Sequence, residues 1–156
     1  MPDVTIRRAT SDDMTALTEL ATLFYKTDGY QTDVTKLNSR LEALRHVDTA
    51  AIFVAELDGA EVIGFVTVLV TSGLEFGMKA EVESLFVRTK VRGQRIGTSL
   101  LEAGCGWAKE QGAEEIFLVI AAQGEPVRQL EQLYLGQGFE PSRRTLMYRS
   151  EAPGEG

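Results

Sequence analysis

The stretch from Glu83 to Thr98 combines residue types that suit the binding of a phosphate group. It holds a run of basic residues, with no acid between Glu83 and Glu102: Arg88, Lys90, Arg92 and Arg95. Gly93 and Gly97 let the backbone approach a ligand closely, and the apolar residues that follow recur at helical spacing. A helix N-terminus attracts phosphate through its unpaired N–H groups and partial positive charge. In a chain of formal net charge -7 this cationic cluster predicts a bound polyanion, but a solvated basic turn would give the same pattern.

Two carboxylates, Glu81 and Glu83, stand on the apolar strand that precedes this cluster. Strict alternation would place both on one face of the sheet with Leu85 and Val87. Beside such apolar residues a carboxyl group is partly desolvated, which raises its pKa toward that of a useful general base. The alternative is that both acids are solvated, or paired with Lys79 and nearby arginines.

The remaining pattern predicts a mixture of strands and helices. Strands are expected over residues 4–8, 50–57, 62–71, 78–87, 115–121 and 144–149. Helices are expected over residues 12–26, from a cap at Asp33 onward, over residues 97–111, and from Glu125-Pro126 onward. Asp58-Gly59 between two apolar runs predicts a hairpin turn. This order indicates an α/β or α+β protein with a mixed sheet.

Composition limits the function classes. A chain of 156 residues forms one domain, expected over residues 1–150 with a disordered acidic tail at 151–156. No apolar run is long enough to cross a bilayer, and the start lacks the pattern of a secretory signal. The single cysteine, Cys105, allows no internal disulfide, as expected in a reducing cytoplasm. One cysteine and one distant histidine, His46, predict no metal site. The acidic balance argues against nucleic-acid binding and weakly favours a cationic substrate.

Taken together, the motifs resemble the GNAT superfamily of acetyl-CoA-dependent N-acetyltransferases, over about residues 4–149. The family's pyrophosphate loop runs Arg/Gln-x-x-Gly-x-Gly/Ala, which here is similar to Arg92-Gly93-Gln94-Arg95-Ile96-Gly97. Arg95 replaces the middle glycine. A helical backbone would tolerate an arginine there, whereas a positive φ would strain it. The later segment Leu133-Tyr134-Leu135-Gly136-Gln137-Gly138-Phe139 resembles the family's Leu-Tyr-x-x-x-Gly-Phe.

The resemblance implies a single-domain GNAT fold with a mixed sheet of six to seven strands, splayed between the fourth and fifth, and about four helices. It implies acetyl-CoA as co-substrate, bound by Leu85, Phe86, Val87, Arg92, Gly93, Gln94, Arg95, Ile96, Gly97 and Thr98. It also implies direct acetyl transfer to a primary amine, with Glu83, or else Glu81, as general base. Tyr134 would be the acid that protonates the departing thiolate, although on its own it would be read as a core residue.

The acceptor is less well defined by the sequence. An aromatic and acidic run between the first two helices could contact a cationic amine or be a solvated loop; it includes Tyr25, Asp28 and Tyr30. A small cation such as an aminoglycoside or a polyamine is the expected substrate. The alternatives are a protein N-terminus or lysine, or a regulatory module that binds CoA without catalysis. No nucleic-acid or membrane partner is expected. Dimers are common in the family, so a homodimer is allowed but fixed by no sequence feature.

Overall fold

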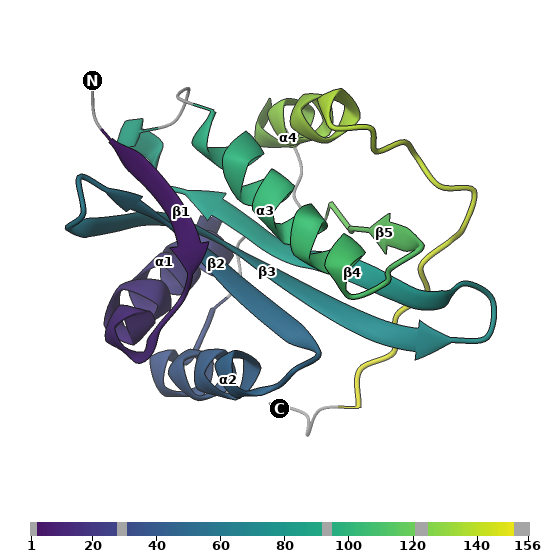
Figure 1. Ribbon diagram of the computed structural model, residues 1–156, viewed down its shortest axis with the longest axis horizontal. Coiled ribbons are helices and arrows are strands. Elements are labelled where there is room, and N and C mark those ends of the chain that lie inside the picture. The colour runs from purple at the N-terminus through teal and green to yellow at the C-terminus, as the bar shows by residue number, and fades with distance from the viewer. Residues whose placement is uncertain (1–2, 28–30, 92–94, 121–124, 152–156) are drawn as a thin grey trace.

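The computed structural model describes residues 3–27, 31–91, 95–120 and 125–151 (Figure 1). Its strands are β1 (Val4–Arg8), β2 (Ala50–Leu57), β3 (Glu61–Gly73), β4 (Gly77–Val87) and β5 (Glu115–Phe117). Its α-helices are α1 (Met14–Thr27), α2 (Val34–His46), α3 (Ile96–Glu110) and α4 (Glu125–Gly136). Two short 3-10 helices, Ser11–Asp13 and Thr89–Val91, precede α1 and follow β4.

The sheet separates two hydrophobic clusters. Its order is β1-β2-β3-β4-β5, with β1 to β4 antiparallel and β5 parallel to β4, so the predicted mixed sheet is confirmed. One cluster, which we call the α3 face, joins α3 and Tyr134 of α4 to the sheet. The other, the α1/α2 face, joins α1 and α2 to the opposite side (Figure 1). Side chains that point to opposite faces are therefore separated by the sheet.

Local signals account for most element ends. The Asp33 side chain accepts hydrogen bonds from the backbone N–H groups of Thr35 and Lys36, which confirms it as the cap of α2. Asp58 and Gly59 both have positive φ, as a tight hairpin turn requires. Each of these features depends on residues close in sequence, which is why the sequence predicts them.

Gly104 lets α3 approach the sheet closely. A Cβ at Gly104 would lie 2.8 Å from Cγ2 of Val68, a fully buried residue of β3, whereas one at Gly106 would meet nothing within 4 Å. We therefore expect Gly104→Ala to lower the free energy of unfolding by about 1–2 kcal/mol, since overpacking outweighs the gain in helix propensity. The matched control Gly106→Ala should raise it by up to about 1 kcal/mol. Urea unfolding of both variants checks this, and similar effects at the two sites would contradict it.

The sheet is smaller than predicted. Within the described residues it has five strands instead of six to seven, and β5 ends at Phe117 instead of residue 121. The strand predicted over residues 144–149 is wrong, because that segment is exposed and pairs with no strand in the described part of the chain. Alternation indicates that a segment is able to form a strand, but a strand also needs an edge to pair with. Most of the predicted tail, residues 152–156, lies outside the described residues.

Candidate active site

The strands β4 and β5 separate soon after they meet. Their parallel ladder covers only Lys79 to Glu81 on β4 and Glu115 to Phe117 on β5, and β4 continues to Val87. The predicted splay between the fourth and fifth strands is therefore confirmed. The proposed cofactor residues Leu85, Phe86 and Val87 lie on the part of β4 beyond this ladder. An acyl-CoA that pairs with strand-edge amides would fit such a divergence.

The start of α3 follows β4 closely. The helix has no acid in its first turn, so nothing there opposes the binding of an anion. A Cβ at Gly97 would lie 3.7 Å from Leu133 of α4 and 3.9 Å from Val87, so the helix start meets α4 and the end of β4. Of the predicted pyrophosphate loop, Arg92, Gly93 and Gln94 lie outside the described residues. The remaining residues, from Arg95 to Thr98, form the N-cap and first turn of α3.

Arg95 has a left-handed backbone conformation, with φ 60 and ψ 20. The left-handed region costs a residue with a Cβ about 1–2 kcal/mol, and glycine avoids that cost. The sequence allowed either a helical backbone or a positive φ at Arg95, and the structure has the positive φ, which is the strained state. Since strain of this kind concentrates where a ligand is bound, it marks the helix start as a candidate site.

Replacing Arg95 with glycine should raise the free energy of unfolding by about 1 kcal/mol, because the left-handed strain is relieved. Arg95→Ala is the control, since it removes the same charge but keeps the Cβ and so the strain. Urea unfolding compares the stabilities, and calorimetric titration with CoA reports the contribution of the charge. If the two variants are equally stable, the left-handed backbone of Arg95 does not lower the free energy of unfolding.

Arg88, which the sequence predicted as part of the cationic cluster at the start of α3, lies elsewhere in the structure. The Arg88 guanidinium lies 3.0 Å from the Glu19 carboxylate of α1 and 4.0 Å from that of Glu61, on the opposite side of β4 from α3. Arg88 therefore links the end of β4 to α1 and does not face the start of α3. Sequence spacing could not indicate this, because Glu19 is distant in the chain.

A β-bulge decides where the two candidate bases point. Thr67 of β3 pairs with Ser84 and Val68 with Val82, so Glu83 is the extra residue of β4. Val82 and Leu85, three residues apart, therefore both lie on the α3 face. The prediction that Glu81 and Glu83 share a face with Leu85 and Val87 is wrong, since a bulge breaks strict alternation. Both acids point to the α1/α2 face, because Glu81 lies between two residues of the α3 face, Ala80 and Val82, and Glu83 contacts Thr67.

The two acids differ in environment. Glu81 is half-buried, and burial raises the pKa of its carboxyl group, with a further increase from the negative charge of Glu83. Glu83 is exposed at the bulge. The desolvated setting that the sequence suggested for both thus applies to Glu81. The two carboxylates together make this part of the α1/α2 face negative.

Two buried hydroxyls support Glu83, and the sequence did not indicate either of them. The Thr67 hydroxyl donates to Oε1 of Glu83 at 3.3 Å and is also in close hydrogen-bond contact with the Ser84 hydroxyl. Thr67 and Ser84 are both buried. Since Thr67 has one proton to donate, its bond to Glu83 requires Ser84 to donate to Thr67. The chain of hydroxyls thereby holds the carboxylate in a fixed direction.

We expect Thr67→Val to lower the free energy of unfolding by about 1–2 kcal/mol, because the buried Ser84 hydroxyl loses its partner. Thr71→Val, at an exposed position of the same strand, is the matched control and should leave the stability unchanged. Urea unfolding of both variants measures the difference. Equal stabilities of Thr67→Val and the wild type would argue against a hydrogen bond between the two buried hydroxyls.

Tyr134 is placed by the end of α4. Gly138 has a positive φ of 89, which turns the chain so that the N–H of Phe139 donates to the Tyr134 carbonyl at 3.0 Å. The Phe139 ring then packs edge-on against Tyr134, at 5.7 Å between centroids. The glycine and phenylalanine of the motif therefore fix the tyrosine. Burial, at 9% exposure, raises the pKa of Tyr134 to about 12, with a smaller contribution from Cys105, so the phenol keeps its proton at neutral pH.

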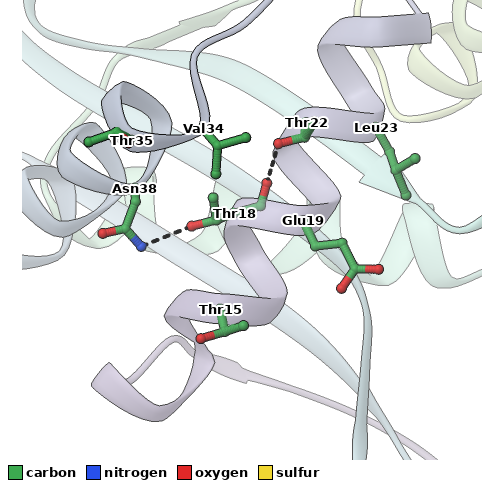
Figure 2. Close-up of a pocket in the computed structure, with 8 residues that line it drawn as sticks. All are labelled: Thr15, Thr18, Glu19, Thr22, Leu23, Val34, Thr35 and Asn38. Atoms are coloured by element: carbon green, nitrogen blue, oxygen red, sulfur yellow. Dashed lines mark hydrogen bonds between the residues drawn. The ribbon is translucent and has the colours of Figure 1, made fainter.

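An open cavity of about 610 Å³ lies between α1 and α2 (Figure 2). It is lined by Thr15, Thr18, Glu19, Thr22, Leu23, Val34, Thr35 and Asn38. Within it, the Asn38 amide donates to the Thr18 hydroxyl at 3.1 Å, and Thr22 donates to the Thr18 carbonyl at 2.7 Å (Figure 2). Glu19 supplies a carboxylate that is paired with Arg88, so the cavity combines hydroxyls, an amide and an ion pair.

The predicted acceptor residues are not found in this cavity lining. Tyr25 packs edge-on against Phe24, at 5.0 Å between ring centroids, beside the core of the α1/α2 face. Asp28 and Tyr30 lie outside the described residues. Glu19, which the sequence analysis missed, is the acid of the cavity. Its only sequence signal is its place on the polar side of an amphipathic helix, which most exposed acids share.

Two classes of site are absent from the part of the chain that the structure describes. It contains no group of three or more histidine, cysteine, aspartate or glutamate residues able to hold a metal ion. None of its helices is long and apolar enough to cross a membrane.

The divergence of the fourth and fifth strands beside the start of a helix is the arrangement that the resemblance to acetyl-CoA-dependent acyltransferases led us to expect. The model of the Acetyltransferase (GNAT) family matches residues 14–139, so the chain belongs to this family. Its co-substrate is accordingly acetyl-CoA. A comparison with curated protein sequences finds no match.

Solved structures support the fold. An integron cassette protein from the mobile metagenome of Cole Harbour Salt Marsh is 23% identical, with a TM-score of 0.82 over 96% of this chain and 91% of that one. Aminoglycoside N-acetyltransferase AAC(6')-Iy in complex with CoA is 18% identical, with a TM-score of 0.80 over 97% of both chains. A predicted acetyltransferase with acetyl-CoA from Clostridium acetobutylicum is 19% identical, with a TM-score of 0.77 over 94% of this chain and 96% of that one. At these identities the similarity is one of fold.

Proposed function

We propose that the protein transfers an acetyl group from acetyl-CoA directly to a primary amine of a small cationic molecule, such as an aminoglycoside or a polyamine. The observation that carries this proposal is the placement of the candidate acid and bases. Tyr134 lies on the α3 face, whereas Glu81 and Glu83 point to the α1/α2 face. Donor and acceptor would enter from opposite faces and meet where β4 and β5 diverge.

On the acceptor side, an amine must lose a proton before it attacks, because an ammonium has no lone pair. Glu83 accepts this proton, directly or through water, and the half-buried Glu81 is the alternative base. The negative charge of the pair also favours a cationic acceptor. The cavity with Glu19 opens between the two helices that cover this same face, and its hydroxyls and amide suit a polyhydroxylated amine.

On the donor side, the chain would position and protonate the acyl donor. Within the stretch Leu85, Phe86 and Val87, a backbone N–H group that points away from β3 would bind its amides and the developing oxyanion. The start of α3 would bind the diphosphate, with Arg95 adding positive charge. Tyr134 gives its phenolic proton to the departing sulfur, and the base on the other face holds the proton from the amine. Acetyl-CoA and amine thus become CoA and amide.

The test is a panel of amines with acetyl-CoA and detection of free thiol. Aminoglycosides and polyamines should give thiol release that saturates with the amine, and mass spectrometry should find one added acetyl group. Peptides with a free N-terminus or a lysine should be poor acceptors. Activity on peptides alone would indicate a protein acetyltransferase, and tight CoA binding without thiol release on any amine would indicate a regulatory module.

A further inference from the structure

The last rung of the β4–β5 ladder places an aromatic ring beside an acid, at the point where the two strands diverge. Phe117 is the final residue of β5 and the register partner of Glu81. Residues that pair across a ladder point to the same face of the sheet. The preceding pair, Ala80 and Ile116, belongs to the α3 face, so Phe117 and Glu81 point to the α1/α2 face. The ring therefore lies on the side from which the acceptor is proposed to enter.

A cation already lies against this ring. The Lys79 ammonium is 5.9 Å from the centroid of the Phe117 ring. Lys79 stands two residues before Glu81 on β4 and so points to the same face. Its own register partner, Glu115, has its carboxylate 3.5 Å from the Arg144 guanidinium. The face of an aromatic ring carries negative charge density and attracts ammonium groups, so Phe117 offers a place for a cation.

A small molecule can reach this part of the α1/α2 face. Lys79, Glu81 and Phe117 are half-buried, and Glu83 is exposed. The ring of Phe24 on α1 packs against rings nearer the end of β4 instead. Glu81 and Glu83 are two residues apart, which is on the order of 6 Å along a strand. A molecule with two ammonium groups on a short chain can therefore contact both carboxylates.

We propose that Phe117 is a specificity-determining residue, whose ring binds a second ammonium group of the acceptor while the reacting amine lies at Glu83. This inference rests on the proposed function and narrows the acceptor to amines with two cationic centres on a short chain. Glu81 supplies the carboxylate beside the second ammonium group. The nitrogen at Glu83 loses its proton and attacks, whereas the nitrogen over the ring keeps its charge, because an aromatic face favours a cation.

Lys79 has to leave the ring when such an acceptor binds. A lysine ammonium stands on a flexible four-carbon stem, so it can move into solvent without disturbing the sheet. Until it moves, it competes with the acceptor for the face of Phe117. Removal of its charge should therefore strengthen the binding of a diamine, because the competition ends and the site becomes more negative.

Binding of two matched amines tests the assignment without turnover. The probes are 1,4-diaminobutane and butylamine, titrated into the isotope-labelled protein in the presence of CoA and followed by NMR chemical shifts. The wild type should bind the diamine at least about threefold more tightly than the monoamine. Phe117→Leu should weaken diamine binding by about three- to tenfold and change butylamine binding by less than about twofold. Lys79→Met should strengthen diamine binding.

Two control variants separate the ring face from general effects on the fold. Phe117→Tyr keeps an aromatic face and should retain the preference for the diamine. Phe53→Leu removes another ring that lies against a cation, 5.5 Å from the Arg8 guanidinium, but on the α3 face, and should change neither affinity. Circular dichroism checks that each variant is folded.

Three results would each overturn the assignment of Phe117. They are equal affinities of the wild type for the two amines, a folded Phe117→Leu that keeps the preference, and no gain in diamine binding for Lys79→Met. The last result applies even if Phe117→Leu does not fold.

The outcome is independent of whether acetyl transfer occurs. Diamine binding that depends on Phe117, without thiol release on any amine, would refute the proposed function and leave the ring assignment standing. Acetylation of 1,4-diaminobutane with a KM that Phe117→Leu leaves unchanged would support the proposed function and overturn the ring assignment. A raised KM with an unchanged kcat is the expected result for a residue that only binds the acceptor.

Discussion

Glu83→Gln should lower kcat/KM for amine acetylation by about 10²–10⁴-fold, the usual contribution of a general base. The amide keeps nearly the same shape and can still contact the Thr67 hydroxyl, so the loss reports the missing base and not a misfolded site. KM for acetyl-CoA should stay within about twofold, because the proposed donor site is built from backbone groups and the start of α3.

The pH dependence of kcat/KM separates the two candidate bases. If Glu83 is the base, its acidic limb disappears in Glu83→Gln. If Glu81 is the base, the limb remains but moves to lower pH, because the negative charge that raises the pKa of Glu81 has been removed. If the acidic limb of Glu83→Gln is identical to that of the wild type, Glu83 is neither the base nor the charge that raises the pKa of a Glu81 base.

Glu81→Gln provides the complementary result through stability. The raised pKa of Glu81 means that the folded state holds its proton more tightly than the unfolded state does. Stability is therefore highest below the ordinary carboxyl pKa and falls as pH rises through the folded pKa. Removal of the ionisable group should make the variant as stable as the wild type or more stable at neutral pH. A lower free energy of unfolding, measured in urea at neutral pH, would contradict this reading of the site.

Tyr134→Phe should lower kcat by about 10²-fold, since the departing thiolate loses its proton donor. Binding of CoA, measured by calorimetry, should stay within about twofold, because the ring and its contact with Phe139 are retained. Tyr148→Phe is the matched control, because that tyrosine is 86% exposed. Equal kcat values for Tyr134→Phe and the wild type would remove the assigned role.

An alkaline unfolding series checks the state of Tyr134 independently of catalysis. Its pKa is raised from 10.0 to about 12, mainly by burial, so the folded state keeps a proton that the unfolded state loses first. The free energy of unfolding should therefore fall as pH rises from 10.0 toward about 12. This part of the decrease should be missing in Tyr134→Phe and present in Tyr148→Phe.

Much of the fold followed from the sequence because the controlling interactions are local. Asp33 caps the helix that begins one residue later, and Asp58-Gly59 takes the positive φ values that its turn needs. The residues from Leu133 to Phe139 position Tyr134 through hydrogen bonds and a ring contact within one helical end. The strand and helix around the cationic cluster were predicted for the same reason, since hydrophobic periodicity is read over short windows.

What the tertiary structure decided depends on residues far apart in the chain. Pairing with β3 makes Glu83 a bulge and turns both acids to the α1/α2 face, where Thr67 supports one of them. An ion pair with Glu19, which is distant in the chain, likewise holds Arg88 away from the start of α3. Residues 144–149 have the composition of a strand, yet they pair with no strand in the part of the chain that the structure describes. Residue type and spacing thus determined which chemical groups the protein has available. Strand register and packing determined which of these groups meet, because register and packing depend on long-range contacts that no local sequence pattern encodes.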